Sequence, residues 1–395
     1  MTASCTPLNS LPSCITRRLL PFAAIVFLGY LTVGIPLAVL PVYLHDTLGC
    51  SATVIGSVMA IQSIATLLTR HLAGAMTDQK GAHHATLVGA VICTLSMLLY
   101  GASTLFQLVP LLSLLLLAIG RVALGLGESL LVTGVLAWSV ATVGSQHAGR
   151  AMVWVGIAIF GAISAGAPLG ALLLAHGFGY VALLSVSMPV VAALLALTQA
   201  PTPLVTGARL PFVNVMSKIW RQGTGLALST MGFGAMFTFL GLYFGVKGWH
   251  GAPYGMTAFG IAYITARLFF GGLPDALGGR ALARVTLPLQ AIGLITIWLA
   301  RAEDAAFIGC ALLGVGYSLT FPALGVDAVR QVPAHSRGAA MGAYVAFVDI
   351  GLGITGVLTG ALADQFGYPI TFLLGAAASI AALALVVTPP RPTSR

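Results

Sequence analysis

Long apolar segments fill most of this chain, and each is long enough to cross a lipid bilayer as an α-helix. A transmembrane helix needs roughly 20 predominantly apolar residues, and only 7% of this chain is charged. The sequence therefore predicts an all-α membrane protein with twelve transmembrane helices. The predicted spans are residues 19–44, 53–75, 85–105, 108–140, 150–175, 180–199, 222–246, 254–274, 283–300, 305–329, 338–362 and 368–388.

The longest polar interruption falls at residues 200–221 and divides the predicted spans six and six. It is rich in proline and basic residues, which is typical of a linker. We therefore expect five regions along the chain. They are a cytoplasmic N-terminal tail (1–18), a first six-helix bundle (19–199), a cytoplasmic linker (200–221), a second six-helix bundle (222–388) and a cytoplasmic C-terminal tail (389–395).

Basic residues are concentrated in alternate predicted loops. If the N-terminus is cytoplasmic, the cytoplasmic segments hold thirteen of the eighteen Lys and Arg residues, and the opposite loops hold Lys247 and Arg301. Cytoplasmic loops of membrane proteins carry an excess of Lys and Arg, so we expect both termini to be cytoplasmic. Dispersal over short loops also explains the formal net charge of +9 without a nucleic-acid partner.

One spaced pattern of four residues occurs twice, 197 residues apart. Its copies are Arg70, Gly74, Asp78 and Gly81, and then Arg267, Gly271, Asp275 and Gly278. Both copies fall at the cytoplasmic end of a predicted span, which indicates two parallel halves related by an axis along the membrane normal. We interpret the pattern as a paired gate, in which each Asp accepts hydrogen bonds from the N-terminal amides of a neighbouring helix. The alternative is that each Asp only caps its own helix.

Ionisable residues inside the predicted spans are the best guide to mechanism, because they are costly in lipid and are usually functional or paired. Arg121 and Glu128 are seven residues apart, which places them on nearly the same helix face, roughly 10 Å apart along the axis. Glu128 is the predicted proton-binding residue, with Arg121 favouring its ionised form. The alternative is a structural charge pair that braces the helix.

Asp349, deep in the eleventh span, is either a second protonation site or the partner of a helix end or an arginine.

Three signatures resemble those of the major facilitator superfamily. The segment from Gly74 to Gly81 is similar to its loop between helices 2 and 3, with Ala82, His83 and His84 in place of the usual basic cluster. The fourth span carries Arg121, Gly125 and Gly127, which resembles an R-x-x-x-G-x-G signature. The fifth span carries Gly161, Gly166, Pro168 and Gly170, which resembles a signature associated with antiporters. Stretches such as Phe321–Gly325 and Phe347–Ile350 resemble a bacterial inner-membrane subgroup labelled arabinose-efflux-like or drug-efflux-like permeases.

The resemblance implies a secondary transporter of the cell inner membrane that works by alternating access. In this superfamily helices 1, 4, 7 and 10 face a central cavity, which implies six candidate lining residues besides Glu128, each with ordinary packing as the alternative. These candidates are Tyr30, Thr32, Thr133, Phe237, Tyr317 and Thr320.

We expect proton-coupled efflux of a small molecule by antiport. The alternatives are symport or facilitated uptake, and a membrane sensor or scaffold that does not transport. The sequence contains no Walker loop, G-x-S-x-G or H-E-x-x-H motif. We therefore expect no enzyme activity, cofactor or metal, and a monomer in the lipid bilayer.

Overall fold

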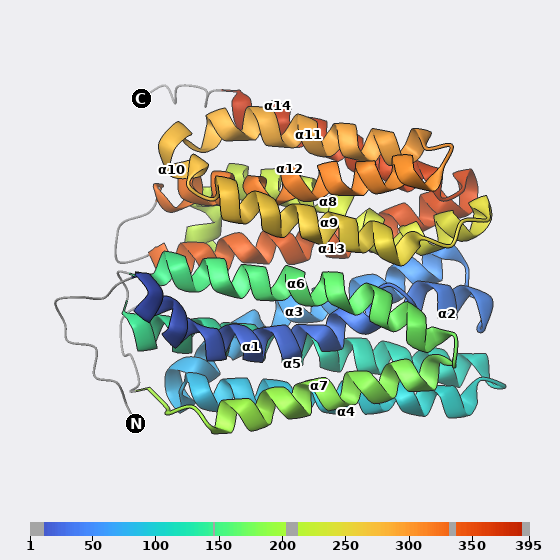
Figure 1. Cartoon of the computed structure of the whole chain (residues 1–395), viewed down its shortest axis with the longest axis horizontal. Helices are drawn as coiled ribbons and strands as arrows, with labels where there is room; N and C mark the ends of the chain where they lie inside the picture. Colours follow the sequence, from blue (N-terminus) through green and yellow to red (C-terminus); the bar gives the residue numbers. More distant parts are fainter. Residues whose placement is uncertain (1–11, 145–146, 203–211, 332–336, 389–395) are drawn as a thin grey trace.

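The computed structural model describes residues 12–144, 147–202, 212–331 and 337–388. Within these ranges the regular elements are all helices, and the long ones lie side by side with nearly parallel axes (Figure 1). Helix α1 begins and α14 ends at the same end of the molecule, here named the terminal end (Figure 1). The opposite end, named the distal end, contains α2 and the turn that leads into α3.

The helices form two sets along the chain. The first set is α1 (Pro12–Leu37), α2 (Leu40–Asp46), α3 (Ala52–Lys80), α4 (Ala82–Ser103), the 3₁₀ turn η1 (Thr104–Phe106), α5 (Pro110–Val143), α6 (Ala148–Leu174) and α7 (Phe178–Leu197). The second set is α8 (Phe212–Lys247), α9 (Ala252–Phe270), α10 (Leu273–Leu277), α11 (Gly279–Leu299), α12 (Glu303–Val329), α13 (Arg337–Phe366) and α14 (Pro369–Val387). Packing within the sets joins α4 to α5 and α11 to α12, whereas α3 against α13 and α6 against α9 join one set to the other.

Eleven of the described helices are long and apolar enough to cross a membrane, so this is a multi-pass membrane protein. The predicted eighth span, 254–274, falls on α9, which is not among the eleven. Pro253, Tyr254, Tyr263 and Arg267 lower the hydropathy of this 19-residue helix. The all-α prediction is confirmed for the described residues.

Several boundaries differ from those predicted. Helix α8 begins at Phe212, inside the segment predicted as a linker, and α1 begins at Pro12, inside the predicted tail. Residues 1–11, 203–211 and 389–395 lie outside the described part of the chain. The first predicted span is broken between α1 and α2, because Pro41 has no N–H to donate to the carbonyl four residues earlier.

The two copies of the repeated pattern adopt different backbones. In the first copy α3 continues without a break through Gly74 and Asp78 to Lys80. In the second copy α9 ends at Phe270 and the short α10 follows, because Pro274 stands where the first copy has Thr77 and cannot continue the hydrogen-bond ladder. The copies agree at their last position, where Gly81 and Gly278 have φ of 95° and 81°. Glycine suits this turn because it adopts positive φ without strain.

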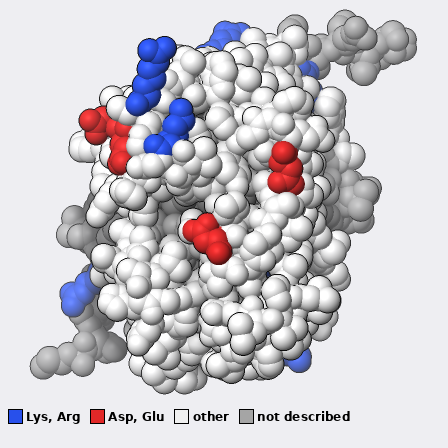
Figure 2. Space-filling model, turned by 90° about the vertical axis from the view of Figure 1, so that its right-hand side faces the viewer, with Lys and Arg blue, Asp and Glu red and all other residues white. Residues whose placement is uncertain are grey.

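The distal end carries few charged side chains. Figure 2 shows this face as mostly uncharged surface with isolated basic and acidic residues. In the described distal turns the Lys and Arg residues are Lys247 and Arg301. The described ends of helices at the terminal end are much richer in Lys and Arg, for example Lys80, Arg150 and Lys218.

Helices α3 and α13 touch through their backbones at glycine residues. A Cβ added to Gly56 would lie 1.9 Å from the carbonyl oxygen of Gly356, and one added to Gly360 would lie 2.5 Å from that of Ala52. Small residues allow membrane helices to approach this closely. This contact therefore sets the distance between the two sets of helices.

We expect Gly56→Ala to lower the free energy of unfolding by about 1–3 kcal/mol, because the added methyl group overpacks the α3–α13 contact. The measurement is the thermal unfolding midpoint of the purified protein in detergent. Gly245→Ala in α8 is the control, since a Cβ there would meet nothing within 4 Å, and it should be neutral or slightly stabilising. Equal midpoints for the two variants would contradict this account of the contact.

Candidate functional site

Glu128 lies on α5 and is held by side chains from two neighbouring helices. Its Oε1 accepts a hydrogen bond from the Tyr30 hydroxyl at 2.5 Å, and its Oε2 accepts one from Gln62 Nε2 at 2.6 Å. Gly125 brings α5 close enough to α3 for the second contact, because a Cβ there would lie 2.4 Å from the Gln62 carbonyl oxygen. Both carboxyl oxygens of Glu128 therefore accept a hydrogen bond.

Arg70 joins the two sets of helices through an ion pair. Its Nε lies 2.7 Å from Oδ2 of Asp349 on α13, and Asp349 is only 7% exposed. Arg70 also interacts electrostatically with Glu128 and Tyr30. We name Tyr30, Gln62, Arg70, Glu128 and Asp349 the charge cluster; it draws on α1, α3, α5 and α13.

The charge cluster contains one cation and two carboxyl groups. With both carboxyl groups ionised its net charge is −1, and a single proton makes it neutral. A net charge is expensive in a low-dielectric interior, so the cluster has a physical reason to bind one proton. Glu128 and Asp349 were predicted from the sequence, whereas Gln62 was not. Its signal was a single amide side chain inside an apolar span.

Arg121 does not pair with Glu128 in the described contacts. Its Nε donates to the carbonyl oxygen of Val58 at 3.2 Å, and its Nη2 donates to that of Met59 at 2.8 Å. The guanidinium thus points across to the backbone of α3 rather than along its own helix. Arg121 therefore braces α5 against α3.

The six predicted cavity residues lie in different environments, and their role in substrate binding stays a prediction. Tyr30 belongs to the charge cluster, and Thr133 is partly buried on α5. Thr32 and Phe237 are buried, Tyr317 stacks on Phe233 with ring centroids 5.0 Å apart, and Thr320 is buried in hydrogen bonds to Thr286 and Gln290. The last four pack in the interior of this structure.

The second repeat copy has a different electrostatic environment. Arg267 is 8% exposed, donates from Nη1 to the Ser318 carbonyl oxygen at 2.9 Å and lies 5.8 Å from the Tyr263 ring centroid. Within the described ranges no carboxylate lies within 4 Å of it. Arg150 and Arg337 are equivalent residues at the start of the fifth and eleventh spans, 187 residues apart. At this offset the residue equivalent to Asp349 is Ala162. The carboxylate that pairs with Arg70 in the first copy therefore has no equivalent for Arg267.

The predicted gate residues Gly74 and Asp78 lie in the last two turns of α3 at the terminal end. Gly271 is the C-cap of α9, and Asp275 lies in α10, but the Asp275 side chain falls outside the described residues. The gating role of both copies stays a prediction.

Asp364 makes a helix cap that the sequence analysis did not find. It lies near the distal end of α13, and its carboxylate accepts hydrogen bonds from the backbone N–H groups of Ala52 and Thr53 at 2.7 and 2.9 Å and from Thr53 Oγ1 at 2.5 Å. The acid therefore caps the N-terminus of α3 from the other set of helices. The only signal in the sequence was an acid close to the end of the eleventh predicted span.

Loss of the arginine should destabilise the protein more than loss of the aspartate. Arg70→Met leaves two carboxyl groups without a counter-cation, and removing one partner of a buried ion pair costs about 3–5 kcal/mol. Asp349→Leu leaves Arg70 with Glu128, so its effect should be smaller, and the double variant should be more stable than Arg70→Met alone. Thermal midpoints in detergent at pH 8 test this order. Equal destabilisation by both single variants would contradict the shared role of Arg70.

Comparison with protein families gives a match to the model described as Major Facilitator Superfamily, at residues 22–351 and 253–395. An uncharacterized MFS-type transporter of Burkholderia pseudomallei (strain 1106a) is 41% identical over 372 residues, covering 94% of this chain and 91% of the relative. An uncharacterized MFS-type transporter of Salmonella typhimurium (strain LT2) is 41% identical over 365 residues, covering 92% and 94%.

Two solved structures share the fold at low sequence identity. The human organic anion transporter MFSD10 (TETRAN) matches with a TM-score of 0.74 and 16% identity, covering 95% of this chain and 100% of that chain. The nucleoside transporter NupG matches with a TM-score of 0.72 and 15% identity, covering 93% and 98%. With the family match over most of its length and relatives at 41% identity, this chain belongs to the Major Facilitator Superfamily of membrane transporters.

Proposed function

We propose that this protein is a proton-coupled secondary transporter that exports a small molecule across the inner membrane by antiport. The observation that carries the proposal is the charge cluster, in which Glu128 and Asp349 share Arg70 at the contact between the two sets of helices. Membership of a transporter family supports the transport part. The two sets act as two six-helix bundles, and the basic residues at the terminal end favour a cytoplasmic location for both chain ends.

Proton binding would change the contact between the bundles through Arg70. When Glu128 is ionised, Arg70 is shared between two carboxylates; when Glu128 is protonated, Arg70 interacts with Asp349 alone. The proton therefore alters the strength of a link between α3 and α13, which lie on different bundles. A ligand shifts a conformational equilibrium only if it interacts differently with the two states, and the cluster provides that difference.

Substrate and proton compete in this mechanism. Glu128 is partly accessible, so a substrate group that hydrogen-bonds to its ionised form would bind after the proton leaves. Symport or facilitated uptake is the alternative within transport, and a sensor or scaffold that does not transport is the alternative outside it. The arabinose-efflux-like or drug-efflux-like subgroup remains an expectation from sequence resemblance.

The function is tested by gradient-driven flux in proteoliposomes. Substrates are first found by a thermal-shift and resistance screen of the overexpressed protein against a chemically broad panel. A pH gradient is then imposed on proteoliposomes that contain the purified protein and each hit. Substrate movement opposite to the proton flow supports antiport, movement with the protons supports symport, and no flux for any hit supports the sensor.

Glu128→Gln should abolish substrate accumulation driven by the pH gradient and leave substrate exchange at equal pH. Glutamine has nearly the same size and shape as glutamate, but it binds no proton. Tracer uptake with and without the gradient measures both activities. Asp304→Asn is the control, since it removes an exposed carboxylate at the distal start of α12. Gradient-driven accumulation by Glu128→Gln at the wild-type level would exclude Glu128 as the proton site.

We propose that the Asp364 cap acts as a distal gate, besides the predicted gate at Asp78. The two lie at opposite ends of α3, so their variants should shift the state populations in opposite directions. Asp364→Asn weakens a charge-assisted helix cap, and losing a cap costs about 0.5–2 kcal/mol, so the distal end should open more often. Asp78→Asn should weaken closure of the terminal end and slow interchange of the states, which lowers the transport rate.

Spin labels at Thr47 and His250, one on each set of helices at the distal end, measure these populations as distance distributions. We expect a larger long-distance fraction for Asp364→Asn and a smaller one for Asp78→Asn. Asp304→Asn serves as the matched carboxylate control. Unchanged distributions and transport rates in both gate variants would remove the gating proposal.

A further inference from the structure

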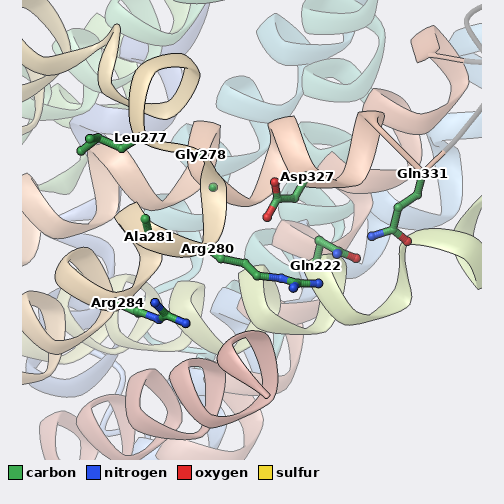
Figure 3. Close-up of a pocket in the computed structure, with 9 residues that line it drawn as sticks. Gln222, Leu277, Gly278, Arg280, Ala281, Arg284, Asp327 and Gln331 are labelled. Carbon is green, nitrogen blue, oxygen red and sulfur yellow. The ribbon is translucent and has the colours of Figure 1, made fainter. Parts of the chain in front are cut away.

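A pocket of about 500 Å³ opens at the terminal end, away from the charge cluster. It lies between the N-terminal half of α8, the end of α10, the first two turns of α11 and the last turn of α12 (Figure 3). This volume falls in the range of small-molecule sites. The lining is mixed, with apolar contacts such as Leu277 and with the polar side chains of Gln222, Arg280, Arg284 and Asp327. None of these residues takes part in the proposed proton mechanism.

Gln222 is a buried polar residue of this pocket with an unused acceptor. Its side chain is 8% exposed, and its Oε1 has no hydrogen-bond partner in the described part of the chain. An unsatisfied buried polar group costs roughly 1–3 kcal/mol. A ligand that places a hydroxyl donor in the pocket would satisfy this oxygen.

Two arginines in the first turns of α11 supply positive charge. Both are exposed, and within the described ranges neither forms an ion pair. Figure 3 shows Arg280 extending toward the side of the pocket that holds Gln222. The N-terminus of α11, which begins after Gly278, adds backbone N–H groups and the positive end of a helix dipole. Guanidinium groups beside a helix N-terminus are a recurrent way to bind phosphate.

Asp327 restricts the charge of the ligand. Two arginines and one aspartate give the pocket a net charge of +1, which matches a ligand with one negative charge. Asp327 also accepts hydrogen bonds only, as does the free oxygen of Gln222. Leu277 at the rim is 59% exposed and offers an apolar contact.

We propose that this pocket binds a phosphate diester that carries free hydroxyl groups. The phosphate lies at Arg280, Arg284 and the start of α11, and the hydroxyl groups donate to Gln222 and Asp327. Two sources share this chemistry: the headgroup of phosphatidylglycerol and a soluble glycerophosphodiester. The site is separate from the transport mechanism, so its test is independent of the transported substrate.

Binding is measured on the full-length purified protein with two probes. Native mass spectrometry and thermal shift follow phosphatidylglycerol in mixed micelles, with phosphatidylcholine as the lipid reference, and glycerophosphoglycerol in solution. The wild-type protein should bind one molecule of at least one probe. Binding of only the lipid identifies a membrane lipid as the source, and binding of both probes identifies headgroup recognition without acyl chains.

Arg280→Gln and Arg284→Gln should each weaken binding about tenfold, which corresponds to about 1.4 kcal/mol. Arg301→Gln is the control, because it removes an exposed arginine at the distal end. Gln222→Leu should also weaken binding, yet it should keep or raise the thermal midpoint without ligand because it removes an unsatisfied buried oxygen.

Three results would overturn the proposal. They are no saturable binding of either probe, equal binding of phosphatidylcholine and phosphatidylglycerol without binding of the soluble diester, and wild-type affinity in both arginine variants. If an arginine variant fails to fold, the Gln222→Leu result alone decides, since wild-type affinity in that variant contradicts the assigned contact.

Discussion

The structure depends on one partly buried cation that joins the two helix sets. Arg70 sits on α3, pairs with Asp349 on α13 and interacts with Glu128 on α5. A charge in a bilayer interior needs compensation, so this arginine links the packing of the two sets to their ionisation state. The same two helices approach closely further toward the distal end, where Gly56 packs against Gly356.

The repeated pattern produces two halves with related topology and different chemistry. Pro274 breaks the second copy, and the position that corresponds to Asp349 is Ala162. The α6–α9 contact is instead aromatic, with Phe160 stacked on Tyr263 at a centroid distance of 3.9 Å. The α3–α13 side of the interface therefore carries an ion pair, whereas within the described residues the α6–α9 side carries aromatic packing and a hydrogen bond from Thr257 to the Ser164 carbonyl oxygen. The proposed proton coupling therefore belongs to the α3–α13 side, where both carboxyl partners of the proposal lie.

The sequence was sufficient to predict most of the helices, because bilayer thickness fixes the length of an apolar span. It also indicated that Glu128 and Asp349 matter, because acids at such depth are rarely incidental. It did not predict the partners. Arg121 and Glu128 were close along one helix, but the Arg121 guanidinium binds carbonyl oxygens of α3.

The ion pair found in the structure joins Arg70 and Asp349, which are 279 residues apart in the sequence. The helix cap made by Asp364 on Ala52 joins residues 312 positions apart. Such contacts follow from the way helices pack, which a single sequence does not specify.

Three elements of the proposed mechanism lie along the same pair of helices. Asp364 of α13 caps α3 at the distal end, Arg70 meets Asp349 further along, and Asp78 lies in the final turn of α3. Ala52 and Arg70 are separated by 18 residues, or roughly 27 Å at the helical rise of 1.5 Å per residue. A helix of that length transmits a tilt at one end to the other with little bending, since its backbone hydrogen bonds are internal. A change in the interaction of Arg70 with Asp349 and Glu128 would therefore act on α3 between its two ends, about two-thirds of the way from Ala52 to Asp78, and both ends carry a proposed gate. This placement explains physically how one proton could favour closure at one end and opening at the other.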